Sequence, residues 1–595
     1  MSLIRCVLAT LTLILMTEFE PNRRVIAEDD IDPLSLVSES AAVCLEVSRF
    51  EAVWTKLQGS RLAARLKQFP PVDRFLAGSG FQQWTLVEEH VRRTTGKSLS
   101  EHLLGAFSES LVLAVYLPEG KPPEGVVIAR ARDAEALKQA LRAWATLEPS
   151  QDSQSRDYRG HTYVRRAKSA TSSQVVYYTT FGRTFAFSDH ERLIQQVIDF
   201  HLSSNRKDSL VADDAPRVLR DLKLYQVNKV RLPADAAAFI FINPRRWDKV
   251  IDEAIRPESD ATWIRPVSRC VSAISGSLRL DDEVVLDLLA DTNSPDLPAA
   301  WRVFVASTNG GSDWQQRIPA DSILAVSSRL DVSPLIQAWL NFAPEARSEE
   351  FKRGRAVLKS LLQGSDFLTE TLPRILRDWT IVLAPAADST SETAPLNLVG
   401  QFSFDSEIAP AGRTMAIQHS VDNALQFGFT FVAALLSHQR GHSDSAPILV
   451  ETESIPSGVV RSLGGLTVWS PSYLVTSRQL TLATSRDALI TSLGPVAGPE
   501  SNRQSRLAAC EQRYFQGTTQ LAWLDAVAVR TLLNRQRDWI TGQLAAKSSD
   551  GQQRVGKHLA NIEQVANLFD AAFIAAGLHE DHVHIVLGAA LDQTD

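Results

Sequence analysis

The sequence predicts an α+β protein made of two tandem repeats of one domain, each a mostly antiparallel sheet with helices packed on one face. Residues 175–200 have the pattern of a strand, a tight turn, a second strand and a helix, and residues 472–493 show the same pattern. Tyr178 then falls on Tyr473, 295 positions later, and the alignment needs no gap. A length of 595 residues also exceeds what one hydrophobic core usually organises.

Composition and charge are those of an ordinary globular protein. Hydrophobic residues make up 44% of the chain and charged residues 22%, which argues against wholesale disorder. The net charge of −7 is small for this length, and no block of Lys and Arg stands out. The sequence therefore predicts no nucleic-acid partner.

The first 27 residues have the pattern of a secretory signal peptide. Arg5 precedes an apolar run at residues 6–16 that is too short to span a bilayer, and acidic residues follow Ala27. Cleavage is expected after Ala27. No later segment has 18 continuous apolar residues, so the processed chain is expected to have no transmembrane segment and to be periplasmic or secreted.

Three cysteines remain in the processed chain, Cys44, Cys270 and Cys510. Three cysteines in this length are not a disulfide framework. Cys44 and Cys270 belong to the same half of the chain and could pair. The positions that match them in the other half are not cysteines, which favours three buried free thiols.

The first repeat is expected to span residues 28–300. Its elements follow one another as strand, helices, hairpin, helix and closing hairpin, at residues 41–47, 48–104, 111–130, 134–147 and 271–290. A further helix is expected near residues 216–224, before a buried strand at residues 237–242.

Two helix starts in this repeat carry capping signals. Ser48 and Glu51 have the spacing of a capping box, in which the hydroxyl accepts from a backbone N–H and the carboxylate reaches back. Asn243 followed by Pro244 is a cap residue with proline at the first helical position. Each pattern predicts that a helix begins directly after its cap residue, Ser48 or Asn243.

The second repeat is expected to span residues 320–595, after a linker at residues 301–319. Its elements match those of the first repeat in the same order, at residues 322–327, 379–404, 415–436, 521–525 and 573–589. Asp525 takes the place of Asn243 as a helix cap.

This pattern resembles a group of secreted bacterial proteins of unknown function that are built from repeated strand–strand–helix units. The resemblance lies in two stretches, residues 319–326 (PADSILAV) at the start of the second repeat and residues 184–188 (TFAFS) directly before a helix. It covers most of residues 38–595. The resemblance implies export and brings no catalytic residues with it.

The motifs of common hydrolase, redox and zinc-protease sites are missing from the sequence, which has no G-x-S-x-G, C-x-x-C or H-E-x-x-H. Ser188, Asp189 and His190 bring together the residue types of a catalytic triad. A triad needs side chains that converge from separate elements, and the second copy of this stretch has no histidine. Helix capping, by Thr484 in the second copy, explains both stretches.

His579, His582 and His584 form the best candidate metal site. His582 and His584 share one face of a strand, and Glu580 or Asp581 could complete the ligand set. The alternative is a solvated hairpin turn, because the matching turn of the first repeat has no histidine. No cofactor is predicted.

The absence of recognisable site chemistry favours an exported, non-catalytic interaction or structural module of the periplasm or cell envelope, with an unidentified protein partner there. Two alternatives stay open. One is an envelope hydrolase whose site is assembled from residues far apart in the sequence. The other is a small-molecule or metal carrier that uses the interface between the repeats.

Overall fold

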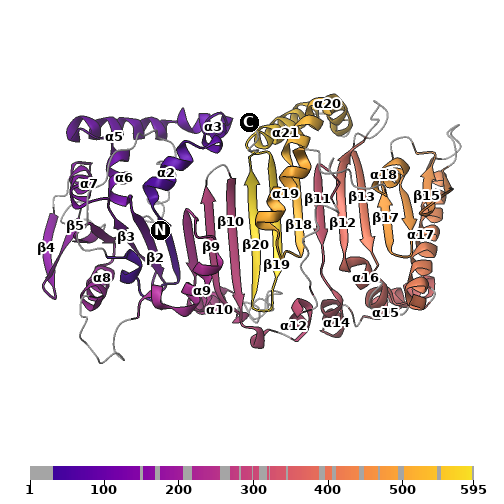
Figure 1. Cartoon of the computed structure of the whole chain (residues 1–595), viewed down its shortest axis with the longest axis horizontal. Coiled ribbons are helices and arrows are strands. Elements are labelled where there is room, and N and C mark those ends of the chain that lie inside the picture. The colour runs from indigo at the N-terminus through magenta and orange to yellow at the C-terminus, as the bar shows by residue number, and fades with distance from the viewer. Residues whose placement is uncertain are drawn as a thin grey trace. The chain divides into compact units, whose positions relative to one another are not determined.

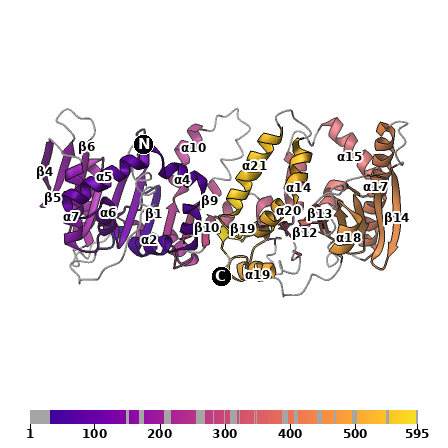
Figure 2. The same cartoon turned by 90° about the horizontal axis from the view of Figure 1, so that it is seen from above.

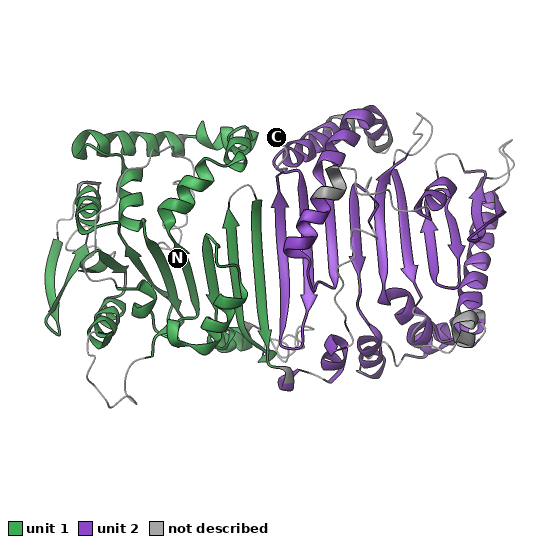
Figure 3. Ribbon diagram, in the orientation of Figure 1, with its two compact units in different colours: residues 1–293 green, residues 294–595 purple. Residues whose placement is uncertain are grey.

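The structure is a computed structural model of the whole chain. It describes residues 31–147, 152–167, 175–204, 217–254, 269–280, 283–297, 299–306, 308, 318–319, 322–342, 346, 348–362, 364–386, 396–404, 411–440, 448–466, 469–493, 502–545 and 551–591. The expected signal peptide and its cleavage site at Ala27 lie outside the described residues. The chain divides into two compact units, residues 1–293 and residues 294–595 (Figure 3).

Unit 1 is built on an antiparallel sheet (Figure 1). Its strands are β1 (Val43–Ser48), β2 (Ser110–Tyr116), β3 (Glu124–Arg130), β4 (Asp152–Tyr158), β5 (His161–Ala167), β6 (Val175–Phe181), β7 (Thr184–Ser188), β8 (Ala238–Ile242), β9 (Val271–Leu280) and β10 (Glu283–Thr292). They lie in the order β10-β9-β8-β1-β2-β3-β7-β6-β5-β4, and every neighbouring pair is antiparallel. The predicted antiparallel sheet is confirmed for this unit.

Unit 2 is built in the same way. Its strands are β11 (Leu324–Ser328), β12 (Trp379–Pro385), β13 (Leu396–Ser403), β14 (Leu449–Ile455), β15 (Gly458–Gly464), β16 (Ser472–Val475), β17 (Gln479–Ala483), β18 (Gln520–Asp525), β19 (Ala571–Leu578) and β20 (His582–Ala590). They lie in the order β20-β19-β18-β11-β12-β13-β17-β16-β15-β14, again antiparallel throughout. Each step of this order has its counterpart in unit 1.

Helices precede the first described strand and occupy the longer connections between strands. In unit 1 they are η1 (Pro33–Leu36), α2 (Phe50–Gln58), α3 (Arg61–Lys67), α4 (Pro70–Leu76), α5 (Ser79–Thr95), α6 (Leu99–Phe107), α7 (Ala134–Leu147), α8 (Glu191–Ser204), η2 (Leu219–Asp221), α9 (Lys223–Arg231), η3 (Pro244–Arg246) and α10 (Asp248–Ala254). In unit 2 they are η5 (Ser294–Asp296), α12 (Ala299–Ala306), α14 (Ser333–Phe342), α15 (Glu349–Leu361), η7 (Phe367–Thr371), α16 (Leu372–Arg377), α17 (Ala411–Arg440), α18 (Arg486–Ser492), α19 (Asn502–Tyr514), α20 (Ala526–Ala545) and α21 (Gly551–Ala566). Part of the expected linker at residues 301–319 is therefore helix α12, which buries Phe304.

Helices cover both faces of the sheet in unit 1, so the prediction of helices on one face is wrong. Val112 of β2 packs in a cluster with Leu193 and Ile194 of α8, whereas its neighbour Leu111 packs in another cluster with Trp54 of α2. Successive side chains of a strand point to opposite faces, so the two clusters lie on opposite sides of the sheet.

Unit 2 has the same double cover. Tyr473 of β16 packs with Val421 of α17, and the next residue, Leu474, packs with Leu489 of α18. A strand that is buried on both faces has a continuous apolar sequence, and residues 111–117 (LVLAVYL) of unit 1 have that pattern. Each unit is therefore a sheet between two layers of helices.

Two of the predicted caps are confirmed and two are wrong. Asn243 accepts a hydrogen bond from Arg245 N at 3.1 Å, and Asp525 accepts from Ala528 N at 2.7 Å. Ser48 caps no helix, because its hydroxyl donates to Glu46 at 3.0 Å instead. In the second copy of the strand–turn–strand–helix stretch, Ser485 rather than Thr484 caps α18.

The three cysteines of the described chain are buried thiols outside any disulfide, as expected. Cys44 lies in β1 and is 1% exposed. Within the described ranges, no helix combines the length and the apolar character that crossing a membrane would need.

Helix α6 contains a buried histidine that predicts a pH-dependent stability. His102 is 4% exposed, and its Nε2 lies 2.8 Å from Thr95 Oγ1. Burial lowers the pKa of His102, Lys97 lowers it further, and Glu101 opposes the shift. The folded chain therefore binds fewer protons here than the unfolded chain, and the stability from His102 is present above the ordinary histidine pKa of about 6.5 and is lost as the pH falls below it.

Replacing His102 by glutamine is expected to flatten this part of the pH dependence, because glutamine can bond Thr95 without titrating. The measurement is hydrogen exchange of the α6 amides between about pH 5 and pH 8. His190→Gln is the control, since that histidine lies on the surface beside Asp189. An unchanged pH profile in His102→Gln would contradict the assignment.

Candidate functional site

Helix α9 carries the densest set of buried polar contacts in unit 1. Tyr225, Asn228 and Lys229 are spaced three and four residues apart, so they share one face of the helix, and that face lies on the sheet. Lys229 and Arg231 stand in the last turn, where positive charge is favourable at a helix C-terminus. The sequence predicted a helix near residues 216–224, whereas α9 begins at Lys223. The prediction was misplaced because the polar residues of α9 form no apolar stripe that would mark the helix in the sequence.

Glu46 of β1 is the centre of these contacts. Its side chain is only 10% exposed, and its Oε2 accepts from the Tyr225 hydroxyl at 2.8 Å and from Lys229 Nζ at 2.6 Å. The Ser48 hydroxyl donates to Oε1 at 3.0 Å. A buried carboxylate needs partners of this kind, since an unpaired charge in the interior is strongly unfavourable.

Aromatic rings pack around the two α9 residues that bond Glu46. The Tyr225 ring packs edge-on against Phe239 and Phe241 of β8, with centroid distances of 5.3 and 5.5 Å. Lys229 Nζ lies 5.7 Å from the Tyr225 centroid and 5.9 Å from that of Phe239. These cation–π contacts add to the attraction between Lys229 and Glu46.

The electrostatics keep the neighbouring titratable groups uncharged. Burial raises the pKa of the Tyr225 hydroxyl far above its usual range, and the charge of Glu46 raises it further. Burial likewise raises the pKa of the Cys44 thiol; Glu46 adds to the shift and Lys229 opposes it. Neither group forms a nucleophilic anion near neutral pH, because the thiolate or phenolate is the reactive form.

A second carboxylate, Asp291 of β10, binds the other end of the same helix face. Asn228 Nδ2 donates to Asp291 and, at 3.0 Å, to the Ser275 hydroxyl of β9, and Arg231 Nη1 lies 3.0 Å from Asp291 Oδ1. Asn228 is fully buried, and Asp291 fixes its orientation because a carboxylate needs the NH₂ group and not the amide oxygen. Glu46, Ser275 and Asp291 thus hold α9 to three strands of the sheet, β1, β9 and β10.

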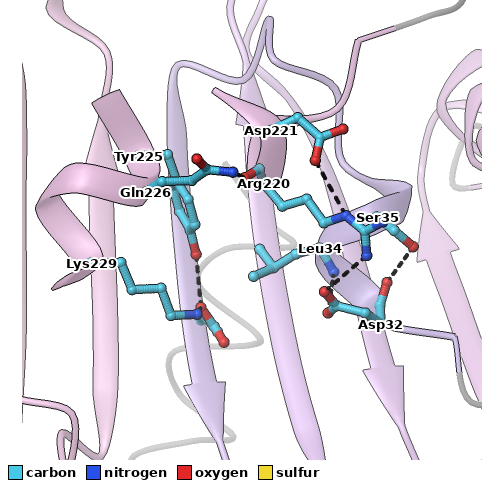
Figure 4. Close-up of polar contacts among 9 residues, drawn as sticks. Asp32, Leu34, Ser35, Arg220, Asp221, Tyr225, Gln226 and Lys229 are labelled. Atoms are coloured by element: carbon cyan, nitrogen blue, oxygen red, sulfur yellow. Dashed lines mark hydrogen bonds and ion pairs between the residues drawn. The ribbon is translucent and has the colours of Figure 1, made fainter. Parts of the chain in front are cut away.

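The N-terminal end of the described chain is held beside α9 by weaker contacts (Figure 4). Asp32 Oδ1 accepts from Leu34 N at 3.1 Å and starts η1. Arg220 Nη1 lies 3.5 Å from Asp32 Oδ2, and Gln226 Nε2 donates to the Arg220 carbonyl at 3.0 Å. The charged pair is about half exposed, so it contributes little to stability.

Taken together, the acidic side chains under α9 are all bonded to cations or neutral donors from this helix and its neighbours. No general base or nucleophile stands ready among them, so the arrangement anchors a polar helix to a sheet. Strand β11 has the place in the strand order of unit 2 that β1 has in unit 1, and it ends at Ser328 as β1 ends at Ser48. Two residues before these ends, β1 has Glu46 and β11 has Val326. The Glu46 contacts are therefore particular to unit 1.

The triad-like residues at the end of β7 do not form a triad. The Ser188 hydroxyl donates to the Gly125 carbonyl at 2.7 Å and accepts from His190 N at 3.0 Å. His190 Nδ1 lies 2.7 Å from Asp189, and this pair is on the surface. The serine hydroxyl thus bonds the backbone ahead of α8, which begins at Glu191, and helix capping in this stretch stays a prediction.

The structure brings two of the three candidate metal ligands together. The rings of His579 and His582 stack with a centroid distance of 4.3 Å, and His582 Nδ1 lies 2.7 Å from Asp581. His584 lies two residues further along β20, opposite Gly577. In the part of the chain that the structure describes, no three His, Cys, Asp or Glu side chains are grouped to hold a metal ion.

Comparison with known proteins leaves the family open. The chain matches no protein-family model and has no significant match among curated proteins. Two solved structures of the protein TP0453, its crystal forms IV and III, are 12% and 11% identical to it. They match 44% and 46% of this chain and 81% and 85% of their own, each with a TM-score of 0.23. A TM-score this low carries no argument about fold or function.

Proposed function

We propose that the chain is an exported, non-catalytic interaction or structural protein of the periplasm or cell envelope. One observation carries the proposal: the two buried carboxylates beneath α9 serve to hold that helix to the sheet. Glu46 and Asp291 are the most buried acids beneath that helix, and both are neutralised by Lys229 and Arg231. The signal-peptide pattern that ends at Ala27 supports export.

We also propose that the two units are tandem copies of one domain, related to the secreted bacterial proteins built from strand–strand–helix units. Two observations support this relation. The strands of the two units pair in corresponding order, and residues 175–200 align with residues 472–493 without a gap. Both stretches contain two paired strands and a helix, β6-β7-α8 and β16-β17-α18.

The proposal predicts a specific protein partner in cells. The full chain with a C-terminal tag is expressed in its native host, the cells are crosslinked, and captured proteins are identified by mass spectrometry. We expect the captured chain to begin at Glu28 and to recover a reproducible partner. The His190→Gln variant is expected to recover the same partner, because His190 is a surface residue bonded to Asp189.

Two results would contradict this proposal. One is recovery of nothing beyond the untagged control under any crosslinking condition. The other is hydrolysis of simple ester, amide or glycoside substrates by the purified chain that disappears in His190→Gln or in Tyr225→Phe. Such a loss would instead support the envelope hydrolase.

A further inference from the structure

Helix α17 of unit 2 has apolar residues on two sides. One side packs into the unit, where Val421, Leu425, Phe429, Ala433 and Leu436 join its hydrophobic clusters. The other side is exposed and carries four large apolar residues, which we call the α17 stripe: Phe427, Phe431, Val432 and Leu435. The two phenyl side chains are 60% and 59% exposed. A surface helix normally keeps one apolar face, so the second one requires an explanation.

The same segment has no charge. Residues 423–439 (NALQFGFTFVAALLSHQ) contain no Asp, Glu, Lys or Arg. A partner with charges at the contact would have to leave them unpaired against this helix, which is unfavourable. The stripe therefore fits a surface that is itself apolar and uncharged.

The shape of the exposed side is a ridge beside a groove. Phe427, Phe431 and Leu435 follow one another at intervals of four residues, and the two phenyl rings are nearly parallel, with centroids 6.5 Å apart. The adjacent row contains Ala424, Gly428 and the stripe residue Val432, and a Cβ added at Gly428 would meet nothing within 4 Å, so the groove is the open space at this glycine. Ridges of this spacing pack into the equivalent grooves of a second helix.

The helix in the same place in unit 1 lacks this surface. Helix α7 follows β3 and precedes β4, as α17 follows β13 and precedes β14. Among the described side chains of α7, no large hydrophobic residue is exposed. The comparison shows that this position in the fold does not by itself require an exposed apolar stripe.

We propose that the α17 stripe binds the α17 stripe of a second copy of this chain, about a twofold axis. An uncharged ridge beside a row that is open at Gly428 can pack against a second copy of itself, which is the condition for a symmetric contact. Helix α17 lies beside β14, the strand that ends the sheet order of unit 2 (Figures 1 and 2). This inference is independent of the proposed envelope partner.

The size of the stripe predicts a weak dimer. At 60% exposure a phenylalanine leaves on the order of 100 Å² in water, so the four side chains offer roughly 400 Å² per copy. Two copies would bury roughly 800 Å² of apolar surface, and the polar rim of the helix brings the contact towards the roughly 1,200 Å² of small specific interfaces. Dissociation constants in the micromolar range are typical of such contacts.

Sedimentation velocity of the full processed chain tests the proposal. We expect a monomer at low concentration and an increasing dimer fraction up to roughly 100 µM. Phe431→Glu is expected to abolish the dimer, because it buries two opposing carboxylates. Leu86→Glu is the matched control: it puts the same charge at a 71% exposed apolar position of α5 and is expected to leave the dimer intact.

A crosslinking experiment checks the geometry without disturbing the stripe. Gly428→Cys puts a thiol in the groove, and Gly354→Cys puts one at an equally open glycine of α15. The native cysteines are buried, so the new thiol is the accessible one. A short bis-maleimide is expected to link two Gly428→Cys chains and to leave Gly354→Cys chains single.

Three results would overturn the proposal: a monomer at every concentration, equal crosslinking of both cysteine variants, or a dimer that survives Phe431→Glu. Binding of the monomer to phosphatidylcholine vesicles that is lost in Phe431→Glu would also overturn it and assign the stripe to a lipid surface. None of these results bears on the envelope partner, which is tested separately by capture from cells.

Discussion

Replacing Gly588 of β20 by alanine is expected to lower the free energy of unfolding of unit 2 by about 3 kcal/mol. Gly588 lies opposite Phe573 of β19, and the phenyl ring lies across the glycine. A Cβ at position 588 would come within 2.1 Å of Phe573 Cζ, which no folded protein tolerates without movement.

The phenyl ring has little room to move away. Phe573 is 3% exposed, and it packs against Tyr514 and Phe515 at the end of α19, with centroid distances of 5.2 and 5.1 Å. Phe515 is itself fully buried. An added methyl group must therefore shift a packed aromatic cluster or the strand backbone, and dense interiors resist both.

Hydrogen exchange of the β19 and β20 amides measures this effect within unit 2, where a whole-chain denaturation curve would mix the two units. Gly542→Ala is the control, since a Cβ there meets nothing within 4 Å in α20 and should stabilise by about 0.5–1 kcal/mol. Gly588→Ala in a Phe573→Leu background should be less harmful than the sum of the single changes. Additive effects would show that the ring does not limit position 588.

The sequence predicted local elements well because their signals are local. The strand, turn, strand and helix at residues 175–200 appear as β6, β7 and α8, and Asp525 caps α20 as expected. These patterns depend on residues within one turn or one hairpin of each other. The antiparallel sheet could be predicted because strands that are joined by short connections pair in antiparallel fashion.

The double layer of helices was missed although the sequence contains a signal for it. The run at residues 111–117 is apolar at every position, whereas a strand with one wet face would alternate. The helix at residues 134–147 was correctly expected, but nothing local states which face of the sheet a helix covers. That choice depends on the packing of segments far apart in the chain.

The polar site was missed for a related reason. Glu46 stands out as the single acid in the apolar strand Val43–Ser48, but its partners Tyr225 and Lys229 lie about 180 residues further along. The nearby Ser48 and Glu51 gave a false capping box: Ser48 bonds Glu46, and Glu51 pairs with Arg132. The spacing of Ser48 and Glu51 alone could not distinguish a capping box from these contacts with Glu46 and Arg132.

Replacing Lys229 by methionine is expected to lower the free energy of unfolding of unit 1 by about 2 kcal/mol. The change leaves the Glu46 carboxylate buried with two neutral donors, Tyr225 and Ser48. Breaking a fully buried ion pair costs about 3–5 kcal/mol. The cost is expected to be lower here because the Lys229 side chain is 43% exposed, so water can hydrate the Glu46 carboxylate once the ammonium group is gone.

A triple variant separates the charge effect from packing. Replacing Glu46 by leucine, Lys229 by methionine and Tyr225 by phenylalanine removes the charges and the hydroxyl together, and the apolar set is expected to unfold within about 1 kcal/mol of the wild type. The readout is hydrogen exchange of the α9 amides, which reports on unit 1 alone. A triple variant less stable than Lys229→Met would show that the polar contacts themselves stabilise α9.

Lys249→Met is the matched control for the single change. Lys249 also pairs with a glutamate, Glu119, but their side chains are 68% and 79% exposed. Solvent screens such a pair, so its loss is expected to leave the exchange of α9 unchanged. Equal effects of the two substitutions would show that losing a lysine, rather than exposing the buried charge of Glu46, destabilises unit 1. A larger effect at Lys229 places the stabilising interaction at the carboxylate beneath α9.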